Sequence, residues 1–158
     1  MPLRSDWSEA TCPIARTLDV VGDPWVLLIL REAVQGVTRY DDFRAALGVA
    51  DGVLSRRLAA MVDDGLMTRA PYRSGNRTRE EYLLTDAGRD LLPVLHALVR
   101  WGETHRPRPT GRLVVVHDGC GHETERPDVC DACGEALTPA NVSWRKPRDL
   151  GRLVPLVR

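Results

Sequence analysis

The sequence contains no long apolar run, no surplus of charge of either sign and almost no lysine. No stretch approaches the roughly 20 apolar residues that a membrane-spanning helix needs, and the N-terminus lacks the uninterrupted apolar core of a signal peptide. We therefore predict a cytoplasmic protein with no membrane segment. The 22 basic and 22 acidic residues cancel to a net charge of zero, so any attraction for nucleic acid must come from a local patch.

Catalytic patterns are also lacking. The sequence shows no Ser/His/Asp set, no paired carboxylates and no phosphate-binding loop, so we predict that it is not an enzyme. Lys146 is the sole lysine among the basic residues. This bias toward arginine favours bidentate contacts with phosphate or guanine, although a GC-rich genome accounts for it equally well.

Positive charge gathers between residues 51 and 79, which hold six arginines against three aspartates. The first part of this stretch predicts a helix whose apolar residues share one side, opposite Arg56. These apolar residues are Leu54, Leu58, Met61 and Val62. Glycine and alanine around Arg56 let the helix approach DNA closely, which suits a major groove. Ser55 and Arg57 flank the same face.

A β-hairpin with a basic tip follows this helix. Gly65 ends the helix, and two strand-like runs flank Ser74-Gly75-Asn76, which favours a turn. Arginines on the hairpin can track phosphate or enter a minor groove. The candidate DNA contacts on the hairpin are Arg73, Asn76, Arg77 and Arg79. In the alternative interpretation, the helix is simply exposed to solvent and the hairpin is an ordinary charged one, and neither contacts DNA.

The rest of the chain predicts more helices and then a small tail. Helical patterns cover residues 14–21, 24–36 and 38–47, and a long one runs from Asp86 to His105. Pro93 should kink the last helix, and we expect part of its wide apolar stripe to bury against a second subunit. His96 in this helix is predicted to be an ordinary interface or surface histidine. A proline-rich linker begins at Arg106, so we predict domains at 1–106 and 107–158.

The tail holds two copies of one pattern, in which a ligand residue is followed by two residues, a cysteine and a glycine. Such turns place two ligands each, and two turns close a tetrahedron around a metal. We predict a structural zinc site formed by His117, Cys120, Cys130 and Cys133, with His122 as the alternative histidine. A metal-free ribbon with reduced thiols, or a redox pair of Cys130 and Cys133, remains open.

Cys12 is the remaining cysteine. It precedes a proline at a predicted helix start, where the helix dipole favours the reactive thiolate. This position makes Cys12 a candidate redox sensor. Packing as a small apolar residue at an interface explains it equally well.

Three runs carry a family resemblance: CPIARTLDVVGDPWVLLILRE, RYDDFRAALGVADGVLSRRLAAMVDDGLMTR and REEYLLTDAGRDLLPVLHALVRWGE. Over Cys12 to Glu103 the chain resembles the HxlR-type winged helix-turn-helix regulators, relatives of the MarR group. The resemblance implies a homodimer joined through the first and last helices of the domain, which binds a palindromic operator and controls a neighbouring gene. It also implies that Leu54 to Asp64 is the recognition helix and that Ser74 to Arg77 is the tip of the wing. The resemblance also implies a candidate sensor, since in some relatives a cysteine at the place of Cys12 responds to disulfide or electrophile stress.

The expected fold is mainly α with some β: a winged helix-turn-helix domain with a long C-terminal dimerisation helix, followed by a small zinc-ribbon-like tail. The expected function is a dimeric transcriptional regulator, a repressor that responds to thiol oxidation, electrophiles or a small ligand. The alternative is a protein-interaction adaptor that docks its partner through the zinc ribbon.

Overall fold

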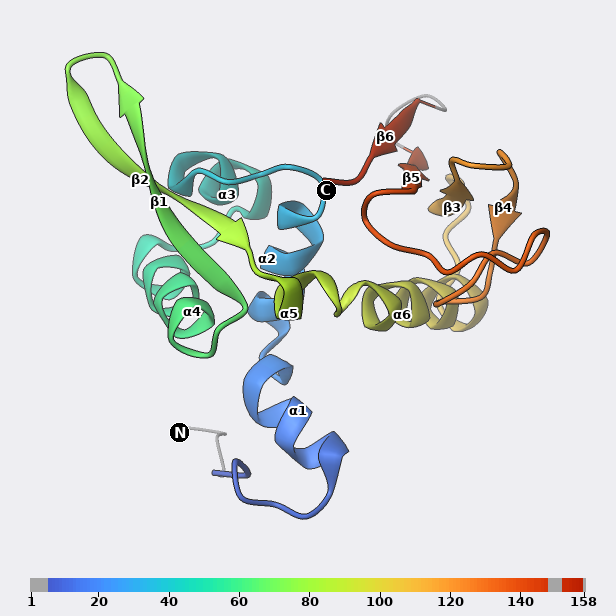
Figure 1. The fold of residues 1–158 in the computed structure, drawn as a ribbon, viewed down its shortest axis with the longest axis horizontal. Coiled ribbons are helices and arrows are strands. Elements are labelled where there is room, and N and C mark those ends of the chain that lie inside the picture. The colour runs from blue at the N-terminus through green and yellow to red at the C-terminus, as the bar shows by residue number, and fades with distance from the viewer. Residues whose placement is uncertain (1–5, 148–151, 158) are drawn as a thin grey trace. The chain divides into compact units, whose positions relative to one another are not determined.

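The computed structural model describes residues 6–147 and 152–157, which belong to two compact units. Unit 1 is Met1–Glu32 with Val37–Thr85, and unit 2 is Ala33–Gly36 with Asp86–Arg158. Figure 1 shows the elements of both units. We predicted a boundary between residues 106 and 107 for domains that fold separately. The two compact units do not show which segments fold separately, so this boundary stays a prediction.

Unit 1 contains the helices expected from the periodicity of the sequence. They are α1 (Pro13–Val21), α2 (Pro24–Ala33), α3 (Tyr40–Leu47) and α4 (Asp51–Asp63). Asp23 caps α2 by accepting the Trp25 N–H at 2.9 Å, as Asp-Pro at a helix start predicts. Gly48 ends α3 in the left-handed conformation with φ 61°, which glycine adopts without steric cost.

Helices α3 and α4 present their apolar sides to one core. Phe43, Leu54, Leu58 and Met61 are each at most 1% exposed. Burying each such side chain stabilises the fold by about 1.5–3 kcal/mol. The predicted core side of α4 is therefore confirmed, and its other side stays available to solvent.

The predicted hairpin is also confirmed. Strands β1 (Met67–Ser74) and β2 (Arg77–Leu84) pair antiparallel from Met67↔Leu84 to Ser74↔Arg77, and the tip extends beyond α3 and α4 (Figure 1). Near the base of the hairpin, the Tyr82 N–H donates to the Thr38 carbonyl at 2.7 Å. This bond ties β2 to the segment that leads into α3.

The segment of unit 2 that starts at Asp86 begins with two helices rather than the single one that we predicted. A turn separates α5 (Asp86–Arg89) from α6 (Leu92–His105). Pro93 explains the break, because it has no N–H to donate and its ring would clash with the carbonyl of Arg89 in a continuous helix. No helix within residues 6–147 and 152–157 has the length and apolar character to cross a membrane.

The tail of unit 2 forms a four-stranded antiparallel sheet in the order β4-β3-β5-β6. Its strands are Val114–His117 (β3), Glu123–Thr124 (β4), Val142–Arg145 (β5) and Leu153–Pro155 (β6). Trp144 on β5 is 1% exposed, and its indole N–H donates to His96 Nε2 on α6 at 3.0 Å. The sheet is therefore joined to α6 by a buried hydrogen bond.

Candidate nucleic-acid interface and metal cluster

The exposed side of α4 carries Ser55 and Arg56. The Tyr40 hydroxyl, at the first residue of α3, lies 3.0 Å from Ser55 Oγ and donates to the Asp51 carbonyl at 3.0 Å. These contacts fix the beginning of α4 against α3. Arg56 forms no ion pair within the described part of the chain, so its guanidinium is available to an external partner.

Arg57 lies on the same helix but is engaged elsewhere. Its guanidinium contacts Asp23 Oδ2 at 2.5 Å, and its side chain is only 34% exposed. Because the other oxygen of Asp23 caps α2, one carboxylate joins α4 to the start of α2. The structure places Arg57 on the scaffold side of α4, and its predicted contact with DNA stays a prediction.

The hairpin places its arginines on both of its faces. Cross-strand pairing puts Arg73 opposite Thr78 on one face, while Arg77 and Arg79 share the other. Arg79 pairs with Asp41 on α3 at 3.1 Å, whereas Arg73 and Arg77 have no ion pair among the described residues. Asn76 is exposed in the two-residue turn beside Gly75, whose φ is 60°. The tip therefore offers two uncompensated cations.

The four residues predicted as metal ligands come together in the tail of unit 2. The ligand atoms of His117, Cys120, Cys130 and Cys133 all lie within 4.8 Å of one another. His117 Nδ1 lies 3.2 Å from Cys120 Sγ and 3.4 Å from Cys133 Sγ, and Cys120 Sγ lies 3.5 Å from Cys130 Sγ. Such a group could hold a metal ion. His122 lies outside the cluster, with its Nδ1 3.1 Å from the Cys120 carbonyl.

Two tight turns build this cluster. The Gly121 N–H donates to the His117 carbonyl at 2.8 Å, and the Gly134 N–H donates to the Cys130 carbonyl at 2.9 Å. Both glycines have a positive φ, 70° and 75°, which explains why glycine follows the second ligand of each turn. Backbone N–H groups of Cys133 and Ala132 lower the pKa of the Cys130 thiol to about 6, which favours the metal-binding thiolate.

Two neighbours of the cluster were missed in the sequence. His117 is fully buried, and its Nε2 has no hydrogen bond but lies 3.4 Å from Glu135 Oε2. A carboxylate beside the outer nitrogen of a histidine orients the ring for metal binding. Gly119 leaves room for that ring, because a Cβ there would lie 3.0 Å from His117 Cε1. Only the position of Glu135 two residues after Cys133 hinted at its role.

Comparison with known proteins identifies the regulator part of the chain. The family model described as HxlR-like helix-turn-helix matches residues 20–110. The chain belongs to the HxlR-like helix-turn-helix family. This HxlR-like chain is 42% identical over 131 residues to an uncharacterised HTH-type transcriptional regulator of Mycobacterium tuberculosis, a match that spans 82% of each chain. The family consists of transcription regulators rather than enzymes, and a DNA-binding helix-turn-helix is what its members share.

Solved structures agree with this assignment. The crystal structure of PA1607, a candidate transcription factor, is 39% identical with a TM-score of 0.70, and the match covers 84% of this chain and 93% of that one. The redox regulator HypR in its reduced form is 30% identical with a TM-score of 0.55, over 60% of this chain and 94% of its own. The match to the mycobacterial relative covers 131 residues, which is more than the 110 residues that end with the family match. The similarity to this relative therefore extends into the tail.

His96 is the residue of this HxlR-like protein whose sequence interpretation needs correction. It is 3% exposed, and its Nδ1 lies 3.1 Å from the Pro127 carbonyl while its Nε2 accepts the Trp144 N–H. Burial lowers the pKa of His96 to about 4, so the imidazole is neutral near pH 7 with its proton on Nδ1. The prediction of an ordinary interface or surface histidine is therefore corrected: His96 is an internal link between α6 and the sheet. Its spacing of four residues from Leu92 is the signal that could have indicated burial.

Proposed function

We propose that the protein is a homodimeric repressor that acts in the cytoplasm by binding a palindromic operator, with α4 as the recognition helix and the hairpin as the wing. The observation that carries this proposal is the exposed Arg56, which has no ion pair among the described residues, on a helix whose opposite side is core. Unpaired Arg73 and Arg77 at the hairpin tip support a role in gripping phosphate. Family membership supplies the general function.

Exposed apolar side chains support the homodimer. Ile14 and Leu18 on α1 are 69% and 46% exposed, and Leu98 and Trp101 on α6 are 47% and 56% exposed. Side chains of this size are costly to leave in water at successive turns of a helix. A second copy of the chain that covers both helices would bury them, as the family resemblance implies.

Zinc is the metal we propose for the cluster, in a structural role. A tetrahedral zinc with bonds of about 2.3 Å to sulfur and 2.0 Å to nitrogen sets its ligand atoms roughly 3.5–3.8 Å apart, close to the distances found here. Three cysteines and a histidine would fill all four positions, which leaves none for a substrate. When bound, zinc would supply cross-linking between the two turns of a tail with a small core.

The DNA proposal is tested by titrating the intergenic DNA beside the protein's own gene across a salt series. We expect selective binding, loss of sequence preference in Arg56→Ala, and in Arg77→Ala a salt dependence that is weaker by about one unit. Arg108→Ala removes an arginine of unit 2 and serves as the matched control. Binding no tighter than to random DNA would refute the regulator and favour the adaptor.

Metal content tests the zinc proposal. We expect one zinc per chain in the purified protein, loss of zinc in His117→Gln, and retention in His122→Gln, which is the matched control. Retention in both variants would exclude His117 as a ligand.

The candidate redox sensor Cys12 is tested separately. Oxidant sensitivity of DNA binding that disappears in Cys12→Ser would support Cys12 as the sensor, and sensitivity unchanged in that variant would refute it.

A further inference from the structure

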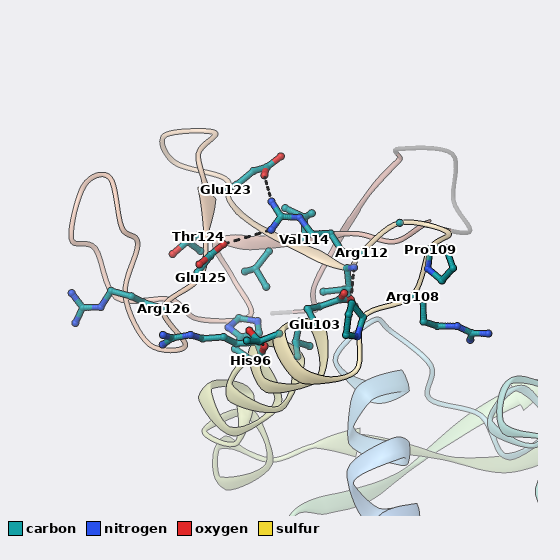
Figure 2. Close-up of a pocket in the computed structure, with 17 residues that line it drawn as sticks. His96, Glu103, Arg108, Pro109, Arg112, Val114, Glu123, Thr124, Glu125 and Arg126 are labelled. Carbon is teal, nitrogen blue, oxygen red and sulfur yellow. Dashed lines mark hydrogen bonds and ion pairs between the residues drawn. The ribbon is translucent and has the colours of Figure 1, made fainter.

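Unit 2 contains a pocket that neither the metal cluster nor the proposed DNA interface uses. Its volume is about 510 Å³, and it is enclosed by α6, the linker after it, β3 and the segment around β4 (Figure 2). This volume lies within the range of about 300–1,000 Å³ that is typical of small-molecule sites. The pocket is therefore large enough for a drug-sized ligand.

The inner surface of the pocket is largely apolar. Val99, Leu113 and Val114 line it, and His96 adds a neutral ring. Both ring nitrogens of His96 are already engaged by Pro127 and Trp144, so the ring offers no free donor to a ligand. A ligand with an apolar body would replace water here at a favourable free energy.

Positive charge exceeds negative charge around this apolar surface. Four arginines and three glutamates line the pocket. Arg112 contacts two of the glutamates, Glu123 at 3.3 Å and Glu125 at 3.5 Å, and Glu123 is also paired with Arg145, so that two arginines offset these two carboxylates. The third, Glu103, accepts the Leu113 N–H at 2.9 Å.

The other three arginines have no ion pair within residues 6–147 and 152–157, although the charge of Arg126 helps to lower the pKa of the Asp131 carboxyl. They are Arg100, Arg108 and Arg126. Figure 2 shows Arg108 and Arg126 at opposite ends of the opening with their guanidinium groups extended outward. These side chains have several rotatable bonds and can turn toward a charge in the pocket. Their number favours an anion over a cation.

The pocket lies on the side of α6 opposite its exposed apolar stripe. At about 100° per residue, Leu98 and Trp101 fall on one side of the helix, while His96 and Glu103 fall on the other. A partner subunit that covers the stripe would therefore leave the pocket open. A ligand bound there would touch both α6 and the sheet of the tail.

We propose that this pocket binds a small organic anion with an apolar body, held by the unpaired arginines at its rim. A regulatory effect of such a ligand rests on the proposed function, whereas its binding does not. Because the test below measures binding alone, its failure is distinguishable from failure of the DNA proposal.

Isothermal titration calorimetry on the full chain tests the proposal with three matched probes: 1-naphthoate, the uncharged 1-naphthamide and the 1-naphthylmethylammonium cation. We expect 1-naphthoate to bind about tenfold more tightly than either other probe, a difference of about 1.4 kcal/mol, because the partly exposed arginines attract its carboxylate. The variant Arg100→Gln/Arg108→Gln/Arg126→Gln should lose this advantage and bind 1-naphthamide unchanged. Arg44→Gln, an exposed arginine of unit 1, is the control and should bind like the wild type.

A second variant separates the pocket from other apolar surfaces. Thr104→Trp places a large ring at an exposed position of the pocket wall and should abolish binding of all three probes while circular dichroism and thermal unfolding stay unchanged. Equal affinity for 1-naphthoate and 1-naphthamide, preference for the ammonium probe, or binding that persists in both pocket variants would overturn the proposal.

Discussion

Acidification should weaken unit 2 through His96. The folded-state pKa of about 4 lies below the ordinary value of 6.5, so between these values the unfolded chain binds a proton that the folded chain does not. The free energy of unfolding therefore rises with pH across this window and is lost as pH falls through it. Protonation would also place an N–H on Nε2, facing the Trp144 N–H that it now accepts.

The difference of about 2.5 pKa units corresponds to a total on the order of 3 kcal/mol, of which about 2 kcal/mol is lost between pH 7.5 and 5.0. Urea unfolding of the wild type and of His96→Gln at both pH values measures it. Glutamine has a donor and an acceptor but does not titrate, so the variant should lose less stability by about that amount. Other titrating groups, the cluster cysteines included, cancel in this comparison. Equal losses in the two proteins would refute the reasoning.

Two further predictions concern the metal cluster and the recognition helix. Gly119→Ala places a Cβ 3.0 Å from Cε1 and 3.2 Å from Nε2 of His117, so zinc should be removed by a chelator at least about tenfold more readily; Gly52→Ala, where a Cβ meets nothing within 4 Å, should behave like the wild type. Arg57→Ala should lower the free energy of unfolding by about 1 kcal/mol through loss of its half-buried ion pair. Arg56→Ala should leave that free energy within about 0.5 kcal/mol and reduce DNA affinity. A stable Arg57→Ala with impaired DNA binding would instead make Arg57 a direct contact.

Local patterns in the sequence were enough to predict helix α4, the hairpin and the cluster of His117 with three cysteines. Each depends on residues close together in the chain: an apolar spacing of three and four, a Gly-containing turn, and paired ligands with two residues between them. The structure accordingly has α4 within three residues of the predicted start, and it gathers His117 with the three cysteines.

Features that depend on distant contacts were not predictable in the same way. His96 and Trp144 are 48 residues apart, and nothing in the spacing of either segment indicates that they meet. The ion pair of Arg57 with Asp23 likewise joins two helices. The sequence of α4 alone therefore could not show that Arg57 contacts another part of the protein. Pro93 indicated that the last helix is irregular. The sequence did not show whether the helix bends or is interrupted, because that depends on packing.

Strand β6 has a consequence for trimming the chain. It occupies the edge of the sheet next to β5, where Val154 pairs with Trp144. Removing β6 would leave β5 with a free row of backbone N–H and C=O groups, an arrangement that recruits strands from other molecules. A truncation just after Arg145 would therefore be expected to aggregate, even though every residue of the regulator part and every cysteine of the cluster would remain.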